Sequence, residues 1–303
     1  MNSKKVNRTF LAAVLIHLGV IAFLYFCSSF YSIGMVANYI VSELIVVLPA
    51  GAALLLSKEK VISFLRFRKV KISTVLMTIL FTMLISPTIS FVNVISQFFV
   101  ENTAAAMSGS MITQPFGITF FFVAIYAPIC EEVVCRGLIL NGYRKSGSVL
   151  SAIILSAVLF ALLHMNFNQA AYAFVVGILL GLLMEATGSI WPGIIVHFLI
   201  NGYQVSLLYF IKWISPQSMQ AAQQVEMTTT VMLGMVVVML VLTAITLPIA
   251  IVILVWMAGN EGRSQNLSAV FKKTAIKKDK TITCSLIIAI ILCLAYMIAV
   301  CFI

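Results

Sequence analysis

Long apolar runs separated by short polar segments dominate the pattern of this chain. Each run approaches or exceeds the roughly 20 residues that a helix needs to cross the hydrocarbon core of a bilayer. Nine such runs can be counted, and they predict an all-α, polytopic bundle of about eight to nine transmembrane helices. The runs cover approximately residues 10–30, 34–56, 73–95, 117–142, 148–164, 169–186, 190–211, 231–257 and 281–303.

The composition agrees with this prediction. Hydrophobic residues make up 62% of the 303 residues, charged residues make up 9%, and the mean hydropathy is +1.12. A soluble domain carries about a quarter charged residues. We therefore expect an integral, multi-pass protein of the cell membrane, with the lipid bilayer as its surroundings.

The formal net charge of +10 does not indicate a nucleic acid partner, because the basic residues stand beside the ends of the apolar runs without interleaved aromatic residues. They cluster at residues 4–8, 58–71, 144–145 and 263–280. If nine spans alternate in direction, all four clusters fall on one side. The positive-inside rule makes that side cytoplasmic, so we expect the N-terminus in the cytoplasm and the C-terminus outside.

The ionisable residues within the runs divide the chain into three parts. Residues 1–116 form N-terminal membrane scaffold helices, residues 117–205 carry the chemistry, and residues 206–303 form C-terminal membrane helices. The six cysteines lie in or beside apolar runs without a CxxC pair, so they indicate neither a disulfide framework nor a zinc ribbon.

The fourth run contains the first cluster of ionisable residues. A charge at the bilayer centre costs ~2.5–3.5 kcal/mol on insertion scales, so such groups usually face a bundle interior or a wet cavity. Glu132 and Arg136 are four residues apart and can pair on one helical face, whereas Glu131 is rotated by about 100° and is left free to act as a general base. Pro128 and Gly137 allow the helix to depart from regular bonding here.

Two more polar pairs follow on later runs. Phe160 stands one turn before His164 and is expected to pack over its imidazole. His197 and Asn201 are also one turn apart, so they project from one face and can donate two hydrogen bonds to a developing oxyanion; the histidine can alternatively bind a metal. Three such clusters, in a chain with only three histidines, predict one shared site.

Other conspicuous residues are interpreted structurally. Glu43, Glu185 and His17 have no companions at a useful spacing, so we assign them no catalytic role. Gly177 and Gly181 form a small-xxx-small face and predict close packing between two helices.

The motifs EExxxR, FxxxH and HxxxN, in this order, resemble those of the CAAX-protease and bacteriocin-processing family, also called Abi. This family of intramembrane endopeptidases is related to the type II CAAX prenyl proteases. In this chain the motifs are filled by Glu131, Glu132 and Arg136, by Phe160 and His164, and by His197 and Asn201.

The resemblance implies hydrolysis of a peptide bond in a membrane-associated or lipidated peptide or protein that enters from the cytoplasmic side. It implies that Glu131 and His164 activate water, and that His197 and Asn201 stabilise the oxyanion. Glu132, Arg136 and Phe160 are then supporting residues, and residues 117–205 are the catalytic core. No cofactor is required in this interpretation.

Three alternatives remain open at this point. In a zinc-dependent version of the same protease, Glu131, His164 and His197 would be ligands of Zn²⁺. A membrane protein that binds a peptide without cutting it, such as an immunity protein, would use the same cavity. A transporter would also carry intramembrane ionisable residues, but we find no pair of similar halves in the sequence.

The relative depth of two site residues leads to one further expectation. Counted back from Arg144 at a rise of 1.5 Å per residue, Glu131 lies ~20 Å deep and His164 ~28 Å deep if both helices are straight. The two meet if residues 147–151 run along the membrane surface, which we therefore predict.

Overall fold

The computed structural model describes residues 1–28, 33–145, 147–215, 228–272 and 281–302, and their regular structure is entirely helical. The longer helices are α1 (Ser3–Cys27), α2 (Met35–Leu55), α4 (Ile72–Ser96), α9 (Val149–Leu163), α10 (Phe167–Thr187), α11 (Trp191–Ile214), α13 (Thr229–Asn260) and α15 (Cys284–Val300). The fourth run is one continuous helix made of α6 (Phe116–Thr119), η1 (Phe120–Tyr126), α7 (Ala127–Glu132), η2 (Val133–Leu140) and α8 (Asn141–Arg144). Short helices in the connections are α3 (Val61–Phe64), α5 (Thr103–Met111) and α14 (Ser264–Ala269).

The predicted all-α, polytopic bundle is confirmed. Seven of these helices are long and apolar enough to cross a membrane, and the shorter apolar helices α9 and α15 account for the other two runs. Large apolar side chains are exposed along α1, α2, α13 and α15, as expected where helices face lipid. The chain is an integral membrane protein.

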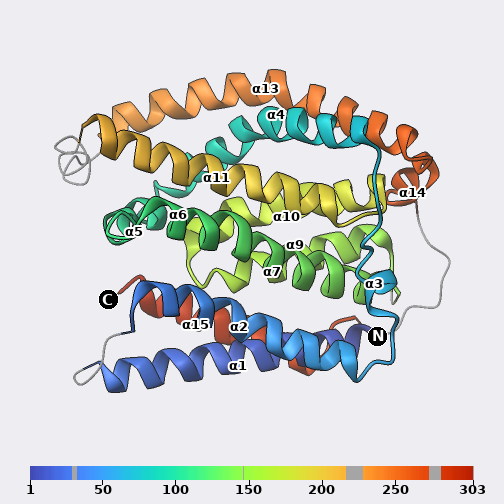
Figure 1. Ribbon diagram of the computed structural model, residues 1–303, viewed down its shortest axis with the longest axis horizontal. Coiled ribbons are helices and arrows are strands. Elements are labelled where there is room, and N and C mark those ends of the chain that lie inside the picture. Colours follow the sequence, from blue (N-terminus) through green and yellow to red (C-terminus); the bar gives the residue numbers. More distant parts are fainter. Residues whose placement is uncertain (29–32, 146, 216–227, 273–280, 303) are drawn as a thin grey trace.

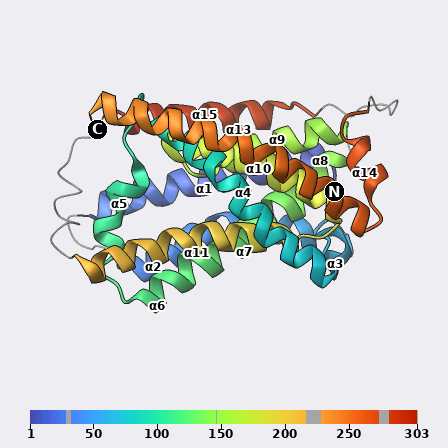
Figure 2. The ribbon, with the colours of Figure 1, turned by 90° about the horizontal axis from the view of Figure 1, so that it is seen from above.

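The helices run along a common axis in three groups (Figure 1). Helix α1 packs against α2 and α15 on one side of the bundle, and α4 packs along α13 on the other. Helices α7, α9, α10 and α11 lie between these two groups. Seen from above, α4 runs obliquely across the bundle, where it contacts α10 and α11 as well as α13 (Figure 2). The motif-bearing helices are therefore enclosed on two sides.

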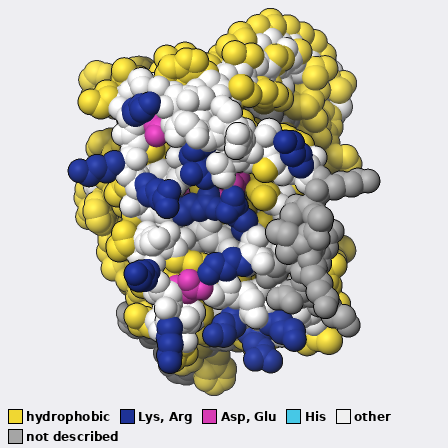
Figure 3. Space-filling view, turned by 90° about the vertical axis from the view of Figure 1, so that its right-hand side faces the viewer, with side chains coloured by type: hydrophobic (Ala, Val, Ile, Leu, Met, Phe, Trp, Pro, Cys, Tyr) yellow, Lys and Arg dark blue, Asp and Glu magenta, His cyan; other side chains and the backbone are white. Residues whose placement is uncertain are grey.

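The two ends of the bundle differ in charge. Successive spans alternate in direction, and the N- and C-termini lie at opposite ends (Figure 1). Lys and Arg side chains gather on the end where the N-terminus lies (Figure 3). The prediction that the basic clusters share one side is thus confirmed for the residues that the structure describes.

Close packing of α10 against α9 confirms the interpretation of the glycine face. A Cβ atom on Gly177 would lie 2.8 Å from the Cα and Cβ atoms of Ala157, and one on Gly181 would lie 2.8 Å from Ile153 Cγ2. No real Cβ atom could be accommodated there without a shift of the neighbouring helix. The two glycines therefore set the distance between the helix that ends at the second motif and its neighbour.

The first part of α9 corrects an expectation. Ser148 caps this helix, because its side chain accepts a hydrogen bond from the backbone N–H of Ser151. Residues 149–151 are therefore already the first turn of α9, so only residues 147 and 148 of the predicted surface segment lie outside this helix. The two motifs meet at another level: Phe160 packs on Arg136, one turn nearer the basic end than Glu132 and His164.

Candidate active site

The helix that carries the first motif is widened on both sides of the paired glutamates. Stretches η1 and η2 are π-helical, and the short α-helical segment α7 between them contains Pro128, Glu131 and Glu132. Pro128 has no backbone N–H, so the regular ladder of hydrogen bonds is already interrupted at this level. Single π-helical turns often occur at functional sites because they shift side chains out of the α-helical register.

Glu132 and Arg136 form the ion pair that their spacing predicts. Arg136 Nη1 donates to Glu132 Oε1 at 2.7 Å, and the side chains are 2% and 0% exposed, respectively. A charge at such a position needs a partner, because removing it from water is costly. The charges of Glu132 and Arg136 therefore neutralise each other in the interior of the bundle.

His197 on α11 stands between the two carboxylates. Its Nδ1 lies 3.2 Å from Glu132 Oε1 and, since a carboxylate accepts, donates to it. Its Nε2 lies 3.8 Å from Oε2 of Glu131, whose side chain is 22% exposed. This separation is too long for a hydrogen bond.

Phe160, near the end of α9, is the apolar centre of the cluster and is 2% exposed. Its ring contacts three polar side chains: the Arg136 guanidinium carbon at 4.2 Å, the His164 ring at 5.0 Å and the His197 ring at 5.9 Å from its centroid. The expected packing of Phe160 over His164 is confirmed. The ring excludes water from one side of the site and orients the groups around it.

His164 follows the last turn of α9 and has one ring nitrogen engaged. Its Nδ1 lies 3.0 Å from the carbonyl oxygen of Phe160, which can only accept. The hydrogen is therefore on Nδ1, and in the neutral ring Nε2 carries a lone pair. Asn201, one turn after His197, donates from Nδ2 to the carbonyl oxygen of Val123 at 3.0 Å. This bond leaves the second N–H of Asn201 Nδ2 for another acceptor.

One further acidic residue, which we interpreted structurally from the sequence, lies in this region. Glu43 of α2 lies near enough to Glu131 for the two carboxyl groups to interact electrostatically. One turn earlier on α2, Tyr39 stacks on Phe122 of η1 at 5.6 Å between ring centroids. The approach of Glu43 to Glu131 joins two helices, α2 and α7, so the spacing of residues within α2 gives no sign of it.

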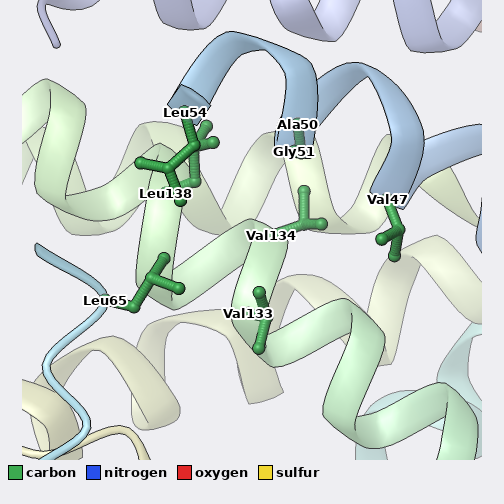
Figure 4. Close-up of a pocket in the computed structure, with 8 residues that line it drawn as sticks. All are labelled: Val47, Ala50, Gly51, Leu54, Leu65, Val133, Val134 and Leu138. Atoms are coloured by element: carbon green, nitrogen blue, oxygen red, sulfur yellow. The ribbon is translucent and has the colours of Figure 1, made fainter. Parts of the chain in front are cut away.

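A small apolar cavity separates α2 from η2 directly after the paired glutamates (Figure 4). Val133 and Val134, the next residues along the chain, project into the space from η2, and α2 closes it from the other side. The cavity is lined by Val47, Ala50, Gly51, Leu54, Leu65, Val133, Val134 and Leu138. The site therefore adjoins an entirely apolar wall.

The remaining residues that we singled out lie in other settings. Glu185 forms ion pairs with Arg66 at 2.9 Å and with Arg144 at 3.0 Å, in agreement with its structural interpretation. His17 is on α1, and its buried Nδ1 atom has no hydrogen-bond partner among the described residues. The six cysteines have free thiols.

The donor atoms of the site can be compared with the needs of a metal ion. Glu131 and His197 face each other, but among the described residues no three His, Cys, Asp or Glu side chains are placed to hold one ion. A catalytic zinc usually has three protein ligands, of which Glu131 and His197 would supply two.

Gly193 in the first turn of α11 makes room for Glu132. A Cβ atom at this position would lie 2.9 Å from Glu132 Oε2. We expect Gly193→Ala to displace the carboxylate, lower thermal stability by about 1–3 kcal/mol and reduce activity. Gly234→Ala on α13 is the matched control, because a Cβ atom added there would have no neighbour within 4 Å. Equal unfolding midpoints for the two variants would contradict this prediction.

Comparison with known proteins finds a family match for the central part of the chain. Residues 113–203 match the family model described as type II CAAX prenyl endopeptidase Rce1-like. The match includes every motif residue from Glu131 to Asn201 and confirms the resemblance inferred from the motifs. It covers less than one third of the chain. No curated protein and no solved structure matches the chain in the same comparison.

Proposed function

We propose that this chain, whose residues 113–203 match the Rce1-like family, is an intramembrane endopeptidase. Its substrate is a membrane-associated or lipidated peptide or protein. The observation that carries the proposal is the contact of His197 with both glutamates in the bundle interior, beside the Phe160 and His164 rings. A purely structural ion pair would need Glu132 and Arg136 alone.

In this mechanism Glu131 is the general base. Within the described part of the chain no guanidinium pairs with this carboxylate, so it is free to take a proton from water. His164 presents the lone pair of Nε2 and accepts the second hydrogen of the same water. The hydroxide then attacks the carbonyl carbon of the substrate, and Glu131 returns the proton to the leaving amine. Water and one amide give one carboxylic acid and one amine.

His197 and Asn201 stabilise the oxyanion that forms in this step. Asn201 contributes the N–H that is not bonded to Val123. His197 contributes Nε2–H, which requires a proton on this nitrogen in addition to the one that Nδ1 donates to Glu132. Removal of one such donor typically costs 10²–10³-fold in kcat, roughly 2.7–4 kcal/mol.

Access and orientation are part of the proposal. The basic end of the bundle faces the cytoplasm of the cell according to the positive-inside rule, so the N-terminus is cytoplasmic and the substrate enters from that side. Residues 117–205 are the catalytic core, and the helices of 1–116 and 206–303 enclose it. No nucleic acid takes part. No cofactor is required, and a zinc-dependent version of the protease is the alternative that the following experiment separates.

The test is cleavage of a quenched fluorogenic peptide library by the full chain in detergent. We expect His164→Gln to lower kcat by about 10²-fold or more, because a group that orients the attacking water is lost. His17→Gln changes a histidine of α1 outside the candidate active site and should leave cleavage unchanged.

A zinc chelator should leave the wild-type rate unchanged. Loss of activity with chelator would favour the zinc-dependent version. Equal rates for the two histidine variants would contradict the role of His164, and absence of cleavage of any peptide would favour a protein that binds peptides without cutting them.

A further inference from the structure

A second polar cluster lies at the basic end of the bundle, separate from the candidate active site. Its centre is Glu185, near the end of α10, which is fully buried. Glu185 Oε1 pairs with Arg66 Nη1 at 2.9 Å and with Arg144 Nε at 3.0 Å. Arg263 adds a third guanidinium, since its Nε donates to the backbone oxygen of Glu185 at 3.3 Å. Arg66 and Arg263 lie in two different connections between helices, and Arg144 is the last residue of α8.

The backbone is shaped to hold these guanidiniums. Arg66 is a non-glycine residue with a φ of +57°, and its carbonyl oxygen accepts a hydrogen bond from the N–H of Ile190 at 3.1 Å. Gly188 has a φ of +70°, and a Cβ atom there would lie 2.6 Å from the guanidinium carbon of Arg263. Left-handed backbone is costly for a residue such as arginine. The backbone conformation at Arg66 and Gly188 therefore fixes the positions of these arginines, unlike those of ordinary surface side chains.

The charges of this cluster do not balance. Burial lowers the pKa of Arg66; Glu185 opposes this shift, and the nearby Arg144 and Arg263 lower the pKa further. Burial also lowers the pKa of Arg263, and Arg68 is among the cations that add to the shift. One carboxylate thus faces several guanidinium groups, which remain charged and repel one another.

We propose that the cluster of Arg66, Arg144 and Arg263 binds a phosphate group, supplied by the headgroup of an anionic phospholipid. Guanidinium groups bind phosphate oxygens through paired hydrogen bonds. Each of the three arginines has one nitrogen engaged at Glu185, and a guanidinium has further N–H groups that can donate to a tetrahedral anion. The cluster lies on the end of the bundle where Lys and Arg gather (Figure 3), at the ends of membrane helices, where headgroups are found. Phosphate binding at this place does not depend on the protease activity.

Binding would compensate the excess positive charge and connect the segments on which the arginines lie. Arg144 ends the helix that carries Glu131, and Ile190, bonded to Arg66, directly precedes α11 with His197. A phosphate bound here would hold the basic ends of these two helices together. We therefore expect its main effect on stability.

The experiment compares thermal unfolding of the full chain in phosphatidylcholine nanodiscs, in the same nanodiscs with phosphatidylglycerol, and in phosphatidylcholine nanodiscs with added inorganic phosphate. We expect phosphatidylglycerol to raise the midpoint by roughly 5–10 °C. The double variant Arg144→Gln/Arg263→Gln should lose most of this shift. Lys5→Gln/Lys60→Gln removes the same charge from exposed positions and should retain it.

The outcomes distinguish a lipid headgroup from free phosphate as the ligand, or they exclude the phosphate site. A shift with inorganic phosphate as well would support the site and assign it to free phosphate. An equal loss of the shift in both double variants, or no shift of the wild type, would overturn the proposal. If the arginine variant does not fold, native mass spectrometry of the wild type is the second measurement: retention of phosphatidylglycerol no greater than that of phosphatidylcholine would overturn it too.

Discussion

Glu131→Gln should reduce the kcat for peptide cleavage by about 10²–10⁴-fold, the usual contribution of a general base. Glutamine has the shape of the carboxylate but cannot take the proton of the attacking water. The side chain of Glu131 is 22% exposed and pairs with no guanidinium among the residues that the structure describes, so we expect the variant to fold as the wild type does. The measurement is the cleavage rate beside the unfolding midpoint of the same preparation.

A binding measurement distinguishes the loss of the general base from a loss of the substrate-binding site. A labelled substrate should bind the Glu131→Gln variant with the affinity of the wild type, because the change removes a proton acceptor and little volume. Glu101→Gln, at an exposed position, is the control that should leave cleavage unchanged. Wild-type cleavage rates in the Glu131→Gln variant would exclude the role of Glu131, and equal binding without any cleavage by the wild type would indicate a binding protein.

The parts of the structure that follow from short-range periodicity could be predicted from the sequence. Apolar length gives the spans, and the i,i+4 spacing gives the Glu132–Arg136 pair. The face of small residues formed by Gly177 and Gly181 predicts the close contact of α10 with another helix, which is α9. Each of these predictions depends only on the residues of one helix and on which of its faces is apolar, charged or small.

The contacts that join distant segments could not be predicted in this way. Glu43 has no partner on its own helix, and only the packing of α2 against α7 brings it to Glu131. The π-helical stretches η1 and η2 are likewise set by packing and rotate residues by amounts that a regular period does not give. For the same reason residues 149–151 could not be placed from helix depth, since straight α-helices of constant rise were assumed.

Glu185 illustrates the same limit at the basic end of the bundle. As a single acidic residue near the end of a span, it gives no sign of three arginines that lie far from it in the sequence. Charge counting predicted that the basic clusters share one side. It did not predict that Arg66 and Arg144 pair with the carboxylate of Glu185 while Arg263 donates to its backbone oxygen. Contacts between residues that are distant in the sequence are set by the tertiary fold. These contacts distinguish the cluster around Glu185 from basic residues that only indicate membrane topology.

Arg136→Met should destabilise the protein by about 3–5 kcal/mol, the loss usually found when one partner of a buried ion pair is removed. The change leaves the Glu132 carboxylate, which is 0% exposed, without its guanidinium, and it also removes the cation from the Phe160 ring at 4.2 Å. The measurement is the midpoint of thermal or detergent-induced unfolding of the full chain. Arg8→Met changes an exposed arginine on α1 and should cost less than about 0.5 kcal/mol.

A double variant identifies the source of this loss. If the unpaired carboxylate is responsible, Glu132→Gln in the Arg136→Met background should recover part of the stability, because the uncompensated charge is then gone. Activity should not return with it, since His197 Nδ1 would still lack a charged acceptor at Glu132. Recovery of both stability and cleavage would mean that the pair only fills space, whereas recovery of stability alone assigns it the positioning of His197.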